Sequence, residues 1–144
     1  MAIINQDWIS EGINACTTIK AYVPKNVDYS SIAGHFVGIK QDTGSPAIST
    51  ATSATPVGVV LEKMDDMYDP FLGDVRSLSK NYYMVRLQIS GIAAVNYSGS
   101  IPTVGSFAEL GPDGNGGVKT VTSGGRSYLV VGSNTITKQI WIVL

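Results

Sequence analysis

The chain alternates short apolar runs with turns rich in glycine, serine and threonine, and it shows no sustained helical pattern. No window keeps apolar residues at i, i+3, i+4 and i+7 over several turns, whereas β-branched residues recur throughout. The pattern predicts an all-β fold, a single compact β-barrel or β-sandwich domain. The expected strands are residues 13–23, 35–40, 46–50, 56–62, 82–96, 106–110, 117–121, 127–131 and 138–144.

The clearest strand is residues 82–96, where apolar side chains alternate with polar ones at the period of a strand with one wet face. Gly91 interrupts this strand. A glycine inside so long a strand marks a bulge or a sharp bend, so we expect the chain to turn a barrel corner or cross from one sheet to another there. The closing QIWIVL is apolar on both faces, which predicts a central strand.

Two segments do not fit the strand pattern. Residues 1–12 form a polar arm that carries Trp8 and Ile9, and residues 61–81 form a long excursion with much of the charge and room for one short helical turn. We therefore expect an extended N-terminal arm, 1–12, followed by one β-barrel or β-sandwich domain, 13–144.

The sequence contains a short internal similarity. GHFVGIKQD (34–42) and GSFAELGPD (105–113) share glycine, phenylalanine, an aliphatic residue and aspartate at the same offsets. Each segment is followed by a glycine-containing turn, a short strand and an apolar strand with a Val-Val pair. Two explanations stay open: a duplicated hairpin unit, or two independent solutions to one turn problem.

Composition narrows the classes of function. The chain has 144 residues with a formal net charge of -1 and 15% charged residues, so it has no basic patch for nucleic acid or for an anionic membrane. Cys16 is the only cysteine, which excludes an internal disulfide; we expect it to be a small buried residue in a strand. No segment has the features of a signal peptide or the apolar length of a membrane span, so we expect a chain made and used without either.

The stretch GPDGNGGVKTV resembles a phosphate or metal loop, but each ligand pattern fails. A P-loop needs lysine where Gly117 stands, and a calcium loop of EF-hand type fails at Gly117, Val118 and Gly124. A dinucleotide fingerprint fails at Lys119. The stretch therefore predicts a β-hairpin turn, with residues 113–117 as an exposed tip without a bound ion.

Candidate chemistry is scarce. His35, the sole histidine, has no serine or aspartate motif beside it, so we expect no catalytic residue, no cofactor and no enzymatic activity. Four aspartates, Asp65, Asp66, Asp69 and Asp74, offer oxygen ligands for a hard cation such as calcium. A solvated acidic surface is the favoured interpretation, and no metal site is predicted.

The order of segments is informative. AGHFVGIKQDTGSPAISTATSATPVGVVLE precedes MVRLQISGIAAVNYSGSIPTVGSFAELGPDGNGGV, with its I-P-x-V-G-x-F step and second D-G turn. Over residues 33–144 this succession resembles the small β-rich capsid cement, or decoration, proteins of tailed bacteriophages. The resemblance implies a virion structural protein that binds the outer surface of the assembled capsid, cements adjacent major capsid subunits and stabilises the head. It implies no catalytic residues.

The resemblance also implies partners. The expected partner is the lattice of the major capsid protein, and a homo-oligomer is expected, with a trimer favoured over a dimer and without nucleic acid or membrane. The protein would be made in the host cytoplasm and reside on the capsid exterior. Trp8 and Ile9 are the candidate capsid or partner contacts, because a loose arm can add a strand or insert anchors on a neighbour. The alternative is an arm that packs on its own domain.

Two other classes remain open. One is a β-sandwich binding module for a glycan or host surface, which would use the aromatic side chains of Tyr68, Phe71, Tyr82, Tyr83 and Tyr97. The other is a small β-barrel enzyme, and the thin inventory of acid and base groups counts against it.

Overall fold

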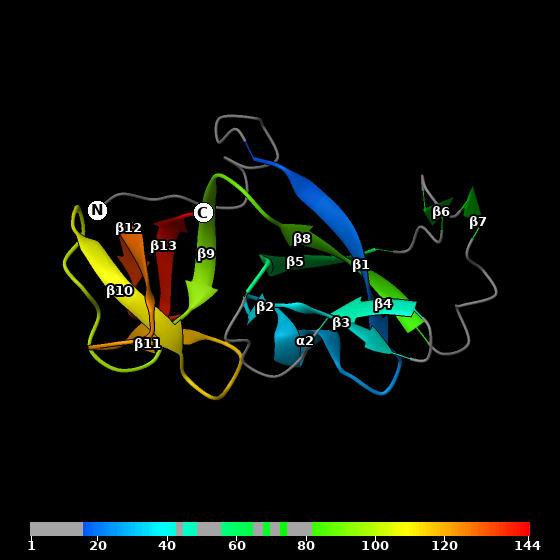
Figure 1. Ribbon diagram of the computed structural model, residues 1–144, viewed down its shortest axis with the longest axis horizontal. Coiled ribbons are helices and arrows are strands. Elements are labelled where there is room, and N and C mark those ends of the chain that lie inside the picture. The colour runs from blue at the N-terminus through cyan, green and yellow to red at the C-terminus, as the bar shows by residue number, and fades with distance from the viewer. Residues whose placement is uncertain (1–15, 43–44, 49–55, 65–67, 70–72, 75–81) are drawn as a thin grey trace.

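The protein is all-β, as the sequence predicts, with two large sheets lying side by side along the long axis (Figure 1). The computed structural model describes residues 16–42, 45–48, 56–64, 68–69, 73–74 and 82–144. The predicted arm, 1–12, lies outside these residues. No helix in the described part of the chain is long and apolar enough to cross a membrane.

The first sheet has six strands in the order β2-β5-β8-β1-β4-β3. Its neighbours are antiparallel except β1 and β4, which pair in parallel at Tyr22 and Ala47. The strand bounds are β1 Thr18–Pro24, β2 Phe36–Val37, β3 Ile39–Asp42, β4 Ser45–Ile48, β5 Gly58–Met64 and β8 Tyr82–Gln88.

A short helix, α2 (Tyr29–Ile32), connects β1 to β2. Asp28 caps it by accepting a hydrogen bond from the amide of Ser30, and Ile32 buries its side chain in the first core. The sequence did not predict this helix, because a single turn is too short to show a helical period.

The second sheet has five strands in the order β11-β10-β12-β13-β9. A parallel bridge between Tyr97, which directly follows β9, and Val118 of β11 joins the two edges of this sheet, so the sheet nearly closes into a barrel. β13 lies between two neighbours, which confirms the central position predicted for QIWIVL. The bounds are β9 Ile92–Asn96, β10 Phe107–Pro112, β11 Val118–Thr120, β12 Arg126–Asn134 and β13 Gln139–Val143.

The predicted crossing at Gly91 is confirmed. The expected strand 82–96 divides into β8 in the first sheet and β9 in the second, with Gly91 at φ 83° between them. The Gln88 side chain is fully buried and stabilises this bend, because its Nε2 donates to the carbonyl oxygens of Ser90 (3.0 Å) and Ile92 (2.6 Å).

Each sheet encloses its own apolar core. The core of the first sheet includes Val37, Val60, Val85 and Leu87. The core of the second sheet is made by inward residues of β9 to β13, and it also contains two side chains of the first sheet, Phe36 and Val59. The first unit therefore completes the core of the second.

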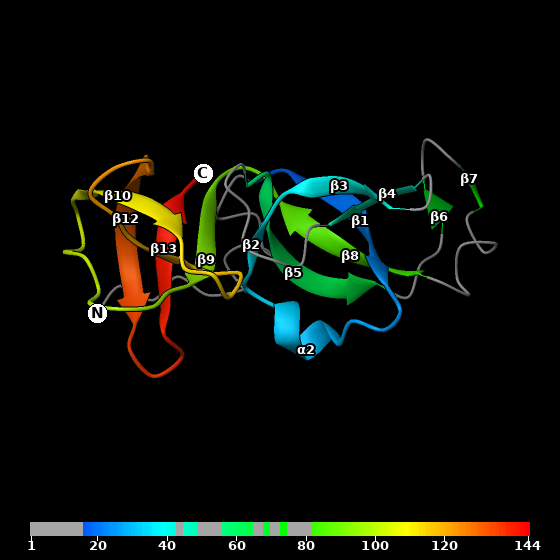
Figure 2. The same ribbon diagram turned by 60° about the horizontal axis from the view of Figure 1, so that its bottom comes forward.

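The two sheets repeat one plan. The antiparallel pairs β1–β8, β8–β5, β5–β2 and β3–β4 correspond to β9–β13, β13–β12, β12–β10 and β10–β11. The parallel pair β1–β4 corresponds to the bridge that closes the second sheet. Even the irregularities agree, because the register shifts once in β5 after Val60 and once in β12 after Val130. Figure 2 shows the two units end to end.

This repeat explains the internal similarity of the sequence. Phe36 pairs with Val59 in the first unit, and Phe107, at the same offset of the similar segment, pairs with Leu129 in the second. The matched pairings favour a duplicated unit over two independent turn solutions. We call residues 18–88 the first unit and 92–143 the second.

Several predicted boundaries were wrong. Residues 35–40 divide into β2 and β3, and β12 continues to Asn134, well past residue 131. Cys16 precedes β1 and is half-buried, so it is not a core residue of a strand. Within the excursion 61–81, β5 continues to Met64, and the short strands β6 (Tyr68–Asp69) and β7 (Gly73–Asp74) pair with each other.

Candidate functional site

The candidate contacts Trp8 and Ile9 lie outside the described residues, as do Asp65 and Asp66. The other two aspartates of the acidic cluster stand in β6 and β7, on a two-stranded sheet. In the part of the chain that the structure describes, no three His, Cys, Asp or Glu side chains form a group suited to a metal ion.

GPDGNGGVKTV forms the β10–β11 hairpin, as predicted. Asp113 organises its loop: Oδ1 accepts hydrogen bonds from the amides of Asn115 (2.7 Å) and Gly117 (3.1 Å). Oδ2 of the same carboxylate accepts one from the Ser98 hydroxyl at 3.1 Å. The carboxylate that resembled a cation ligand in the sequence thus binds the amides and hydroxyl of its own fold.

The expectation that residues 113–117 form an exposed tip was wrong in part. Gly114 and Asn115 are exposed, but Gly116 and Gly117 are buried. The carbonyl of Gly116 accepts a 2.8 Å hydrogen bond from the amide of Phe36, so the loop packs against the first unit. A Cβ on Gly116 would lie 2.1 Å from Nδ1 of His35, so only glycine fits there.

Asn96, the last residue of β9, is the centre of the joint between the units. Its amide donates to Gly34 O (2.9 Å), and its Nδ2 donates to Ala33 O (3.0 Å). Its Oδ1 accepts from Nε2 of Gln139 at 3.0 Å. Gly34 has φ +80°, and a Cβ there would lie 2.4 Å from that Oδ1. Because His35 follows Gly34 directly, the sole histidine is part of this structural joint.

A small cavity of about 30 Å³ lies at the joint. Phe36 and Tyr128 line it, with ring centroids 5.8 Å apart. The volume suits a water molecule rather than an organic ligand.

A larger and more open hollow, about 470 Å³, lies between residues 97–102 and β11. Its one ionisable side chain besides Tyr97 is Lys119. The Tyr97 hydroxyl bonds to Ser100 O (2.5 Å) and Thr120 Oγ1 (2.6 Å), so it stabilises the wall of the hollow. These groups offer polar contacts but no pair of an acid and a base.

The structure buries three of the aromatic residues proposed for glycan binding. Tyr82, Tyr83 and Tyr97 are 5%, 8% and 5% exposed. The Tyr83 hydroxyl donates to Val27 O at 2.8 Å, and burial, assisted by the Asp28 carboxylate, raises its pKa. These three rings have no free face for a sugar. The Tyr68 backbone lies in β6, and Phe71 lies outside the described residues.

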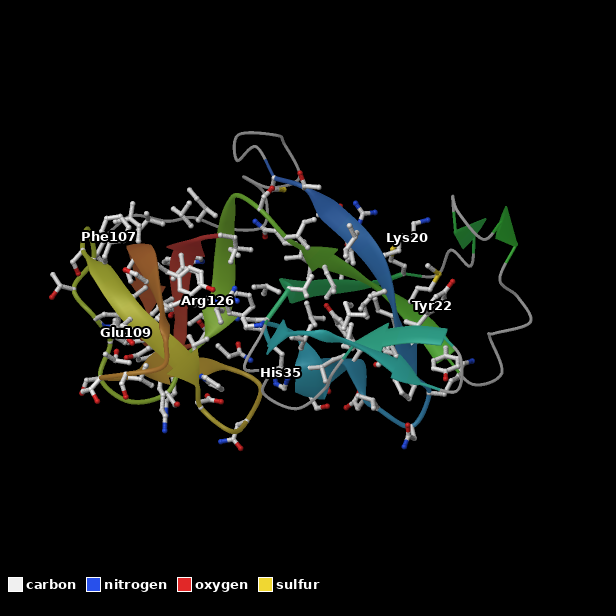
Figure 3. The ribbon with its side chains drawn as sticks, in the orientation of Figure 1. Lys20, Tyr22, His35, Phe107, Glu109 and Arg126 are labelled. Atoms are coloured by element: carbon white, nitrogen blue, oxygen red, sulfur yellow. The ribbon has the colours of Figure 1, made fainter. Side chains whose placement is uncertain are left out.

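The second unit carries an apolar row that the sequence analysis missed. Strand register places Ile92 opposite Val143, and Leu129 opposite Phe107, on outward positions of four adjacent strands. Phe107 is 72% exposed and Val143 38% exposed, while the other two are half-buried. We call these four residues the outer row; Figure 3 shows Phe107 on β10, far from His35.

The outer row has a buried counterpart in the first unit. Register places Gln88, Val59 and Phe36 where the second unit has Val143, Leu129 and Phe107. All three are at most 5% exposed, and Phe36 and Val59 pack into the core of the second unit. The sequence held one signal for the outer row, the phenylalanine that the two similar segments share, Phe36 and Phe107. It did not show that Phe36 is covered and Phe107 is exposed.

The fold and these surfaces define an all-β protein of two repeated units with an open apolar row on the second. Comparison of the chain with family models, with curated proteins and with solved structures found no match.

Proposed function

We propose that this chain is a decoration protein of a tailed bacteriophage, which binds the outer surface of the capsid and cements adjacent major capsid subunits. The observation that carries the proposal is the order of segments over residues 33–144, which resembles that of capsid cement proteins.

The repeated fold supports this proposal. The two segments that carry the resemblance contain the β3–β4 hairpin and the turn of the β10–β11 hairpin, and these hairpins occupy equivalent places in the two units. Two similar units on one chain are suited to a lattice that presents the same surface many times. Contacts of modest strength per unit become strong when several engage together.

The surface chemistry is compatible with this role. With a net charge of -1 and 15% charged residues, the chain has no strong field for nucleic acid or for anionic lipid. The open apolar positions and the strand edges are features through which a β protein adds to a neighbour. We therefore propose a structural, non-enzymatic role without a cofactor.

The partners follow from the same proposal. The chain binds the major capsid protein lattice as a homo-oligomer, with a trimer favoured over a dimer, after synthesis in the host cytoplasm. Trp8 and Ile9 are the proposed capsid contacts. The glycan-binding alternative has less support, since its three described tyrosine side chains are buried.

Occupancy on phage heads tests the proposal. Purified protein is mixed with heads that lack it, and the bound copies per particle are measured by electron microscopy together with the temperature at which the heads rupture. We expect saturable binding at defined lattice positions and a higher rupture temperature. No binding at saturating protein would refute the proposal.

A variant pair sharpens the test. Trp8→Ala removes a proposed anchor, whereas Ile136→Ala changes a side chain that is 92% exposed in the β12–β13 turn. Only Trp8→Ala should lower occupancy. Equal occupancy of the two variants would remove Trp8 from the capsid contact, even if the protein binds.

A further inference from the structure

We infer that the outer row of the second unit is the docking surface of the N-terminal segment, residues 1–12, of the same chain. The inference concerns the free protein and does not depend on the proposed function.

The outer row lacks the cover that the equivalent positions of the first unit have. In the first unit the equivalent positions are buried: Phe36 and Val59 pack into the core of the second unit, and Gln88 is fully buried. In the second unit the same positions hold Phe107, Leu129 and Val143, which are more apolar, since Val143 stands where the first unit has a glutamine. A surface whose counterpart is buried, and which is itself apolar, is expected to have an occupant.

The N-terminal segment leaves the described structure beside this row. The amide of Thr17 donates to the Ser90 hydroxyl at 2.8 Å, and the Thr17 carbonyl accepts from the amide of Ile89 at 2.9 Å. Ser90 is two residues from Ile92, the first member of the row. The chain before Thr17 therefore begins at the near end of the outer row.

The length of that chain is sufficient. The 15 residues before Cys16 span at most about 50 Å when extended. The row crosses four neighbouring strands, from β9 through β13 and β12 to β10, a width of roughly 14 Å at the usual spacing between strands. The segment can reach every member of the row from its own chain.

The segment also has matching chemistry. In AIINQDWISEG, Ile4 and Trp8 are four residues apart, so an extended segment places both on one face, where they can contact the row. A short tether holds such a segment at a millimolar effective concentration, which favours its own chain over a second copy.

Fluorescence of Trp8 tests the inference. The chain has two tryptophans, so Trp141→Phe in the full-length protein leaves Trp8 as the only one. We expect Trp8 emission at a shorter wavelength than in the unfolded chain, weak quenching by acrylamide, and no change on dilution. Emission like that of the unfolded chain would overturn the inference, and emission that changes on dilution would assign the row to a second copy instead.

A matched pair of replacements locates the contact. In the Trp141→Phe background, Phe107→Ser should shift Trp8 emission to longer wavelength and increase its quenching, whereas Ile136→Ser, also a change at an exposed site, should not. Equal responses would refute docking on the row. Val143→Ser serves as the second row variant if circular dichroism shows that Phe107→Ser disturbs the fold.

A second readout uses the protein with Trp141 intact. Trp8→Ser should uncover the row and increase binding of an apolar dye, and Phe107→Ser added to Trp8→Ser should reduce that binding again. Dye binding that Trp8→Ser leaves unchanged would contradict the inference.

Discussion

Phe36 and Phe107 occupy equivalent positions in the two units. Truncating each to alanine therefore measures how much free energy of unfolding the burial of Phe36 at the joint contributes. Phe36 is 5% exposed and contacts Tyr128, whereas Phe107 is 72% exposed. A phenylalanine buries about 200 Å² when covered, which at about 25 cal/mol per Å² gives about 5 kcal/mol as an upper bound. Measured truncations of buried phenylalanine cost about 3–5 kcal/mol, and we expect Phe36→Ala to fall in this range.

The same reasoning gives a small cost at the second site. With most of its surface exposed, Phe107 buries about a quarter of its area, so Phe107→Ala should lower the free energy of unfolding by about 1 kcal/mol or less. Urea denaturation followed by circular dichroism measures both values, and thermal midpoints should fall by about 2–4 °C per kcal/mol. Both variants are made in the Trp8→Ser background, so that docking of the N-terminal segment does not add to the cost at Phe107. Equal losses would then refute the claim that the second unit covers Phe36 and leaves Phe107 uncovered.

Three further predictions use described contacts. Gly116→Ala combines φ +89° with a Cβ 2.1 Å from the His35 ring, so it should lower the free energy of unfolding by about 2 kcal/mol or more, measured by urea denaturation. Gly114→Ala, at φ +88° in open space, should lower it by about 1 kcal/mol. Equal losses would contradict the contact between Gly116 and His35. Gln88→Leu leaves two carbonyls at the bend without their donor, so it should lower the free energy of unfolding by about 1–3 kcal/mol, and an unchanged midpoint would contradict this. Hydrogen bonds from Ser30 lower the pKa of Asp28 from its ordinary value of 3.8. The stability that the Asp28 carboxylate contributes is therefore complete above pH 3.8 and is lost as pH falls through the lowered pKa. The NMR shift of the Ser30 amide reports this titration, and a midpoint at or above 3.8 would contradict the cap.

Much of the fold was predictable because its signals are local. Alternation of apolar and polar residues identified the strands, and Gly91 marked the crossing between sheets, since a glycine at positive φ lets the chain bend there. The hairpin after residue 112 followed from its proline, aspartate and glycines. The helix α2 and the boundaries of β2 and β3 did not follow, because elements this short leave no periodic pattern.

The candidate surfaces were less predictable. The sequence analysis proposed several tyrosines as exposed rings for glycan binding. Three of them, Tyr82, Tyr83 and Tyr97, are buried. Whether an outward side chain is exposed depends on what packs over its sheet, and that is a non-local property. The sequence did not predict the burial of Gly116 in the loop 113–117 either, because that burial depends on packing against the first unit.

The sequence by itself determined the all-β class, the bend at Gly91, the hairpin turn and the scarcity of acid and base groups, because propensity, turn geometry and residue inventory are properties of short segments. Only the tertiary structure showed that the short similarity between 34–42 and 105–113 belongs to two complete units with the same pairings and the same register shift. The tertiary structure also decided that Phe36 is covered and Phe107 is open, since equivalent positions in a repeat differ only in the neighbours that the fold brings to them.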